Sequence, residues 1–309
     1  MAPEWSPQRR ITPELAADVI AAQFPELADQ DVRAFDAGWD NAVLAVGERW
    51  LFRFVHREIA VDGSRRELAV LSRISELPLP IPRPRFVGRP TPEVPWPFWG
   101  AERLPGTELA ASGLADRAEV AAALGGFLRE LHDPARLAQV GAGALPVDPI
   151  GRADPARQAL RAEQRLTSIA RGADDTDVRD RADDLLVRSA PLRRAALRLA
   201  PGRGRVLVHG DLHGRHVLVE GSSPTGVIDW GDTAVSDPAV DLMVAWASFG
   251  PADRAVFWEA YGRDDAGRRL RARATALNVC SALAEQAAAD GRVEIAAEAF
   301  AGAARACDD

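Results

Sequence analysis

The chain has 309 residues and a mass of 33.2 kDa, enough for one large domain or two lobes with a full hydrophobic core. Its composition, 47% hydrophobic and 27% charged, is ordinary for a soluble globular protein. The net charge of -7 argues against a nucleic-acid partner, and no run approaches the ~20 apolar residues that span a membrane. Because the two cysteines, Cys280 and Cys307, are too few for a disulfide framework, we expect a cytoplasmic protein.

Arginine is the only strongly basic residue of the chain: all 38 basic residues are Arg, and Lys is absent. A mechanism that depends on lysine, through a Schiff base or through an ammonium group on a phosphate, is therefore excluded. In place of a lysine ammonium group, a guanidinium group can make bidentate contacts with a phosphate.

The first hundred residues predict a helix followed by short strands. Residues 12–29 have helical apolar spacing, and Thr12 and Pro13 form a favourable N-cap and first-turn pair. Further along, alternating and helical patterns predict strands at 31–35, 42–46 and 50–55, a helix at 63–75, and strands at 85–87 and 99–104.

The remainder of the chain is predominantly helical in pattern. Leu104-Pro-Gly106 predicts a link between two lobes, which would divide the chain into residues 1–103 and 104–309. Helical patterns follow at 119–132, within 152–199 and from 238 to 301. The expected class is therefore α+β, with a small β-rich N-lobe and a larger, mostly helical C-lobe.

The most informative stretch runs from Val206 to Asp232. An apolar run ends in His209-Gly-Asp211, a polar loop leads to His216, and a second apolar run begins at once. Seven residues of turn chemistry, 220–226, precede a third run that ends at Asp229. We interpret the pattern as strand, loop, hairpin and strand, with Asp211, His216 and Asp229 at the same end of a small sheet. A loop aspartate with metal ligands after it is typical of a kinase phosphoryl-transfer site.

His209-Gly-Asp-Leu-His-x-x-His216, together with Ile228-Asp-Trp-Gly231, resembles the aminoglycoside phosphotransferase family, small-molecule relatives of protein kinases. That family usually has Asn where this chain has His216, a departure that resembles the macrolide-phosphotransferase branch. The resemblance implies a bilobal protein-kinase-like fold, Mg²⁺, and ATP or GTP as phosphoryl donor. It also implies an antibiotic or metabolite as acceptor, with neither nucleic acid nor membrane as partner.

The resemblance assigns roles within the catalytic loop. Asp211 would orient the acceptor hydroxyl and accept its proton, and Asp229 would coordinate Mg²⁺ through carboxylate oxygen. His216 would either ligate a second Mg²⁺ as neutral imidazole or orient a water molecule or Asp211. We expect His209 and His213 to fix the loop rather than to react.

The resemblance also assigns cofactor-binding residues in the N-lobe. Arg53, on a strand, and Glu67, on the next helix, resemble the kinase Lys–Glu pair, although a solvated arginine and a surface glutamate are the alternative. The loop from Gly38 to Asn41 is either a phosphate-covering loop or a hairpin turn. The segment that contains Ala101 and Arg103 should offer backbone groups to a purine.

Three alternatives remain beside an antibiotic kinase. A metabolite kinase of the same fold, acting on choline, homoserine or a sugar-like acceptor, would have the same catalytic chemistry. A zinc hydrolase based on the loop histidines is disfavoured, because Gly210 and Gly214 oppose the helix that would align them. A nonenzymatic nucleotide-binding module is the third, and the presence of both Asp211 and Asp229 argues against it.

Overall fold

The computed structural model describes residues 7–37, 41–262 and 265–308, and these form two compact units. The first unit comprises Met1–Ile74, Ile81–Leu104 and Asp229–Thr233. The second comprises Ser75–Pro80, Pro105–Ile228 and Ala234–Asp309. The sequence predicts a single boundary after residue 103. In the structure, Ser75–Pro80 packs with the second unit and Asp229–Thr233 with the first. Asp229, predicted as a metal ligand, thus belongs to the first unit, where it pairs with Arg53.

The N-terminal helix α1 (Pro13–Gln23) begins as predicted and ends earlier. The Thr12 hydroxyl accepts the Leu15 N–H at 3.3 Å, and Pro13 occupies the first turn. The expected end at residue 29 is wrong because Pro25 disfavours a helical conformation at Phe24, whose φ of -133° ends the helix. A 3-10 turn, Pro25–Leu27, follows.

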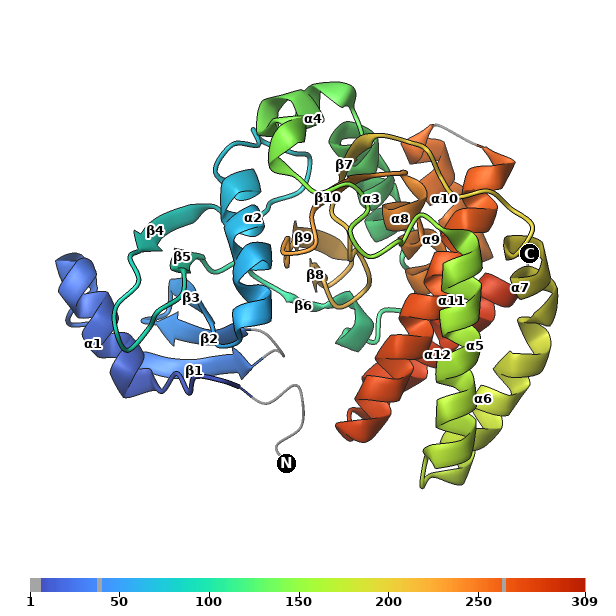
Figure 1. Ribbon diagram of the computed structural model, residues 1–309, viewed down its shortest axis with the longest axis horizontal. Coiled ribbons are helices and arrows are strands. Elements are labelled where there is room, and N and C mark those ends of the chain that lie inside the picture. The colour runs from blue at the N-terminus through green and yellow to red at the C-terminus, as the bar shows by residue number, and fades with distance from the viewer. Residues whose placement is uncertain (1–6, 38–40, 263–264, 309) are drawn as a thin grey trace. The chain divides into compact units, whose positions relative to one another are not determined.

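A five-stranded antiparallel sheet forms the framework of the first unit (Figure 1). Its order is β1 (Val32–Ala37), β2 (Asn41–Val46), β3 (Trp50–Val55), β5 (Phe98–Glu102) and β4 (Pro84–Gly88). On β3 the predicted alternation is confirmed: Phe52 and Phe54 are fully buried, and Phe54 stacks on Phe98 with ring centroids 4.7 Å apart. Burial of each ring contributes roughly 1.5–3 kcal/mol. Arg53 therefore points to the opposite face, where α2 (Val61–Leu71) supplies Glu67.

Helices make up most of the second unit, as predicted (Figure 1). Their bounds are α3 (Ala118–Leu131), α4 (Pro134–Val140), α5 (Pro155–Gly172), α6 (Thr176–Arg188), α7 (Ala190–Ala196), α8 (Ala239–Leu242), α9 (Val244–Ser248), α10 (Pro251–Tyr261), α11 (Ala266–Ala289) and α12 (Val293–Cys307). Close packing of α3 on α10 requires Gly125, because a Cβ there would lie 2.4 Å from the carbonyl oxygen of Phe257. No helix in the described ranges is long and apolar enough to span a bilayer.

Two small sheets in the second unit carry the predicted catalytic loop. β6 (Thr107–Glu108), β8 (Val217–Glu220) and β9 (Ser223–Val227) form one, and β7 (Val206–Val208) pairs with β10 (Ala234–Ser236) in the other. The expectation of one small sheet is therefore wrong, because β7 finds its hydrogen-bond partner in β10. The expected long turn is also wrong: Gly221, with φ of 59°, reverses the chain, and β9 begins at Ser223.

Candidate active site

A buried carboxylate fixes the start of the loop that follows β7. The Asp241 carboxylate accepts the N–H groups of His209, at 2.7 Å, and Gly210, at 2.9 Å. His132 Nε2 lies 3.2 Å from the same carboxylate, and neither side chain is exposed. The sequence analysis missed Asp241. Its one signal was a charged residue inside the apolar run 238–249, where a carboxylate is retained only with partners.

His209 fixes the loop rather than taking part in chemistry. Its Nε2 lies 2.9 Å from the carbonyl oxygen of Ile228, and its Nδ1 accepts the Asp211 N–H at 3.3 Å. This pattern assigns the proton to Nε2. Burial lowers the pKa of His209, so the ring is neutral and joins the loop to the end of the hairpin.

The carboxylate of Asp211 is held from two sides. Arg152 donates to Oδ1 at 2.9 Å and also to the carbonyl oxygen of Gly210, while His213 Nε2 lies 3.6 Å from Oδ2. Burial would raise the pKa of Asp211, but the charge of Arg152 and the hydrogen bond from His213 outweigh it and hold that pKa well below its usual range. The group is therefore an oriented carboxylate throughout the neutral pH range. Arg152, 59 residues away in sequence, was not singled out by sequence analysis.

The two remaining loop histidines differ in the ring nitrogen that carries the proton. His216 Nδ1 lies 2.8 Å from the carbonyl oxygen of Asp211, so it carries the proton and Nε2 keeps a lone pair. His213 Nδ1 accepts the Arg215 N–H at 3.3 Å, so its proton lies on Nε2 toward Asp211. Ligand atoms of Asp211, His213 and His216 all lie within 4.8 Å of one another, a spacing that could hold a metal ion. The hydrogen bonds favour His216 as ligand and His213 as a support for Asp211.

In the first unit, Arg53 lies between two carboxylates. Its Nη1 is 3.1 Å from Glu67 Oε1, and its Nη2 is 3.1 Å from Asp229 Oδ1. The ion pair predicted between Arg53 and Glu67 is thus present, and Glu67 is 1% exposed rather than a surface residue. Glu67 also accepts the Trp230 N–H at 3.0 Å, which ties the segment after β9 to α2. Asp229 has a φ of 66°, a conformation that aspartate tolerates better than most residues and that often marks functional sites.

Burial and the neighbouring charges shift the pKa values of Glu67 and Arg53 in opposite directions. Burial raises the pKa of Glu67 to about 7 against the attraction of Arg53, and the Asp229 charge adds to the increase. Burial lowers the pKa of Arg53, but the charges of Glu67 and Asp229 outweigh it, so the guanidinium stays protonated. We take the effect of burial on Glu67 as the dominant one because its carboxylate is almost completely enclosed.

These residues fit a magnesium–nucleotide complex chemically. Asp229 offers carboxylate oxygen, the donor that Mg²⁺ prefers, and its side chain is 42% exposed. The Nε of Arg53 is buried with no hydrogen-bond partner among the described residues, which leaves a donor for a phosphate oxygen. His216 fits less well, since Mg²⁺ favours oxygen over nitrogen.

Of the other predicted nucleotide-binding residues, Asn41 and Ala101 lie on strands of the first sheet. Gly38 lies outside the described residues, and Asn41 is the half-buried first residue of β2, paired with Val55. Ala101 is buried within β5 between β3 and β4. The Arg103 N–H already donates to the carbonyl oxygen of Arg49 at 2.8 Å, so that donor is in use. The roles of all four residues remain predictions.

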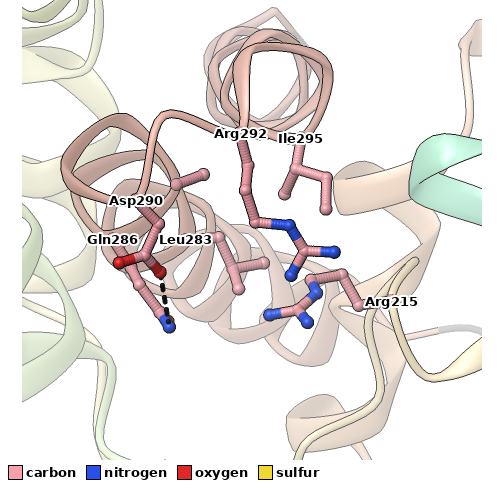
Figure 2. A pocket seen from close by; sticks show the side chains of 7 residues that line it. Arg215, Leu283, Gln286, Asp290, Arg292 and Ile295 are labelled. Carbon is pink, nitrogen blue, oxygen red and sulfur yellow. Dashed lines mark hydrogen bonds between the residues drawn. The ribbon is translucent and has the colours of Figure 1, made fainter. Parts of the chain in front are cut away.

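Two adjoining hollows lie beside the catalytic loop in the second unit. They share Arg215, Leu283 and Ile295, and their empty volumes, about 180 Å³ and about 300 Å³, include open solvent. His213 lines the larger one, together with residues of α11 and α12. Figure 2 shows the smaller one, in which the guanidinium groups of Arg215 and Arg292 point toward each other beside Leu283.

Comparisons with known proteins agree with the fold and the motifs. Residues 31–276 match the model of the phosphotransferase enzyme family (APH). Viomycin phosphotransferase of Streptomyces vinaceus is 43% identical over 60 residues, which cover 18% of this chain and 21% of that protein. The chain matches about a fifth of the length of its curated relatives.

Solved structures resemble the chain over nearly its whole length. The GDP complex of aminoglycoside 2'-phosphotransferase-IIIa has a TM-score of 0.64 at 20% identity, covering 96% of this chain and 99% of that one. The apoenzyme of macrolide 2'-phosphotransferase MphH from Brachybacterium faecium has a TM-score of 0.55 at 25% identity, covering 94% and 97%. These likenesses confirm the expected bilobal, kinase-like fold.

Proposed function

Because the chain belongs to the phosphotransferase enzyme family, we propose that it is a Mg²⁺- and nucleoside triphosphate-dependent O-phosphotransferase that acts on an antibiotic hydroxyl. The observation that carries the proposal is Asp211, an ionised carboxylate fixed by Arg152 and His213 on a loop of the expected type. Arg53, held by Glu67, and Asp229 would supply the groups that contact the triphosphate and its metal ion. We place the reaction in the cytoplasm, which supplies triphosphate and Mg²⁺.

In the proposed reaction, Asp211 accepts the hydrogen bond of the acceptor hydroxyl. The hydroxyl oxygen forms a bond to the γ-phosphorus of ATP or GTP, the bond from that phosphorus to the β–γ bridging oxygen breaks, and the nucleoside diphosphate leaves. The hydroxyl proton passes to Asp211 and then to water. Since such transition states are loose, we assign Asp211 mainly an orienting role, which its two-sided support suits.

Asp229 would hold one Mg²⁺ and the Nε2 of His216 a second, and the ions neutralise phosphate charge when bound. Arg53 would donate to phosphate oxygens, and Glu67 keeps its guanidinium in place. We further assign Gly38 and Asn41 to the phosphate cover, and the backbone around Ala101 and Arg103 to the purine.

We propose an antibiotic as acceptor because antibiotic phosphotransferases are among the relatives of this chain. Viomycin, aminoglycoside and macrolide phosphotransferases are among the proteins that this chain resembles. The hollows beside His213 and Arg215 hold little more than a water molecule, so they would form one wall of the acceptor site rather than the whole pocket. Their apolar residues, such as Leu283 and Ile295, would pack against a ring system.

A metabolite kinase of the same fold is the second candidate. The observation in its favour is a group of three arginines at the start of α5. Arg152 is hydrogen-bonded to Asp211, and Arg157 and Arg161 donate to the loop that carries Arg152. Their charge would repel a polycationic aminoglycoside. The catalytic residues would keep the same roles with either acceptor.

Coupled nucleotide turnover tests the proposal. Purified protein is assayed with ATP and with GTP against aminoglycosides, macrolides, choline, homoserine and hydroxy acids. Saturable, acceptor-dependent turnover that Asp211→Asn removes would support an O-phosphotransferase. Magnesium–nucleotide binding without turnover of any acceptor would favour a nonenzymatic module instead.

A further inference from the structure

The loop before α5 presents Arg152 to Asp211 in a fixed conformation. Asp148 has a φ of 39°, and its carboxylate accepts the N–H groups of Arg152, at 2.8 Å, and Ala153, at 3.2 Å. The Thr275 hydroxyl donates to the carbonyl oxygen of Arg152 at 3.3 Å. The backbone of Arg152 is therefore held at both ends while its side chain reaches the catalytic carboxylate.

Two more arginines converge on the same loop. Arg157 and Arg161 lie one turn apart on α5, and both donate to the carbonyl oxygen of Ile150, at 3.2 Å and 3.4 Å. Gly151, with φ of 69°, makes room for Arg157, since a Cβ there would lie 2.3 Å from its Nη1. We call Arg152, Arg157 and Arg161 the arginine cluster.

The cluster carries more positive charge than its neighbours offset. Within the described part of the chain, neither Arg157 nor Arg161 has a carboxylate within ion-pair distance. The nearby carboxylates of Asp148 and Asp154 accept backbone N–H groups instead. Burial and the charges of Arg157, Arg165 and Arg152 lower the pKa of Arg161, as mutual repulsion requires. A bound anion would relieve that repulsion.

We infer that the arginine cluster is an anion subsite that holds a carboxylate or phosphate group of the acceptor while its hydroxyl meets Asp211. The inference rests on the proposed function, because it takes Asp211 as the group that receives the hydroxyl. Arg152 links Asp211 to the rest of the arginine cluster, since its guanidinium is hydrogen-bonded to Asp211 and its charge acts on Arg161.

Charge at the subsite selects the acceptor class. Guanidinium groups bind carboxylate and phosphate through paired N–H donors, so Arg157 and Arg161 would orient an anionic group and direct the hydroxyl. A polycation would be repelled by Arg157 and Arg161 and by Arg152, the one of the three that contacts the catalytic carboxylate. The subsite therefore favours a hydroxy acid or a phosphorylated alcohol over an aminoglycoside, whether the acceptor is an antibiotic or a metabolite.

Calorimetric titration of inorganic phosphate tests the subsite without catalysis. Saturating Mg²⁺ and the non-hydrolysable analogue AMP-PNP occupy any donor site, so that phosphate reports on the acceptor side. We expect saturable binding that weakens at least tenfold in Arg157→Gln/Arg161→Gln and is largely restored in Arg157→Lys/Arg161→Lys. Arg179→Gln/Arg181→Gln, on the surface of α6, is the matched control and should bind as the unaltered chain does. Absence of phosphate binding, or equal losses in both glutamine pairs, would overturn the inference.

Turnover separates this inference from the proposed function. With an acceptor that carries a carboxylate, the Arg157→Gln/Arg161→Gln change should raise KM at least tenfold and leave kcat within about threefold, while the acceptor's neutral amide shows no such change. Phosphate binding at the cluster with no turnover of any acceptor would defeat the proposed function alone. Turnover of a polycation, unaffected by the double change and without phosphate binding, would defeat the subsite alone.

Discussion

Arg53 holds Asp229 by an ion pair of 3.1 Å, so the carboxylate proposed for Mg²⁺ already has a cationic partner. The same guanidinium binds Glu67, which in turn accepts the N–H of Trp230. The ion pairs of Arg53 with Glu67 and Asp229 therefore join strand β3, helix α2 and the segment after β9. Any divalent ion at Asp229 must share the carboxylate with Arg53 or displace it, which ties metal binding to the position of Arg53.

Replacement of Asp229 by Ala should remove the dependence of nucleotide binding on Mg²⁺. The variant loses the only carboxylate assigned to the ion, and Arg53 keeps Glu67 as its partner. We expect ATP affinity in excess Mg²⁺ to fall at least tenfold, about 1.4 kcal/mol or more, toward the value measured without metal. Fluorescence titration with and without Mg²⁺ measures this affinity, and Asp62→Ala, at an exposed position of α2, is the control. A variant that still responds fully to Mg²⁺ would exclude Asp229 as the ligand.

Asp211→Asn should lose turnover and keep nucleotide binding. Asn retains an oxygen that can accept the Arg152 hydrogen bond, so the loop should stay in place, but it cannot accept the hydroxyl proton. Loss of a positioned base commonly costs roughly 10²–10⁴-fold in rate. Single-turnover assays and nucleotide titration on the same preparation measure both quantities. Full activity in this variant would remove Asp211 from the mechanism.

Local patterns in the sequence were sufficient to locate the loop residues. Asp211, His216 and Asp229 belong to the stretch from Val206 to Asp232, in which strand, loop and hairpin signals follow one another. Strand β3 lies where its alternation predicted. Arg152 could not be found in this way. It reaches Asp211 across 59 positions, and its placement depends on the turn at Asp148, which no periodicity encodes.

Strand pairing was the other feature beyond the reach of the sequence. β7 and β10 are three residues each, too short for a periodic signal, and their pairing depends on how the chain returns after Thr233. The same return brings Asp241 under the loop, where it accepts two backbone N–H groups. Both features follow from tertiary packing and required the structure.

His216→Asn should remain active with an altered metal preference. Asn supplies an oxygen donor, which Mg²⁺ prefers to imidazole nitrogen, so half-saturation should need several-fold less Mg²⁺. The amide N–H₂ can still donate toward the Asp211 carbonyl, which His216 Nδ1 now contacts at 2.8 Å. Rates measured across Mg²⁺ and Mn²⁺ concentrations test this, with His56→Asn, outside the loop, as control. Complete inactivity of a folded variant would point to proton transfer or acceptor binding by His216 instead.

The buried carboxyl of Glu67 should make stability depend on pH. Its pKa rises from 4.5 to about 7 on folding, mainly because burial disfavours the charged form. Between these values the folded chain holds a proton that the unfolded chain has released, so stability is greatest below about pH 4.5 and falls as pH rises to about 7. The shift corresponds to about 3 kcal/mol, and the contribution is constant at higher pH.

Glu67→Gln should remove that component of the pH dependence while keeping an acceptor for the Trp230 N–H. Urea denaturation at pH 5, 6, 7 and 8 measures the free energy of unfolding of the variant, the unaltered chain and an exposed control, Glu26→Gln. The stability of Glu67→Gln relative to the unaltered chain should rise from pH 5 to pH 7 and then level off, whereas Glu26→Gln should show no trend. Parallel curves for Glu67→Gln and the unaltered chain would mean that Arg53 keeps Glu67 ionised across this range, with its attraction exceeding the cost of burial.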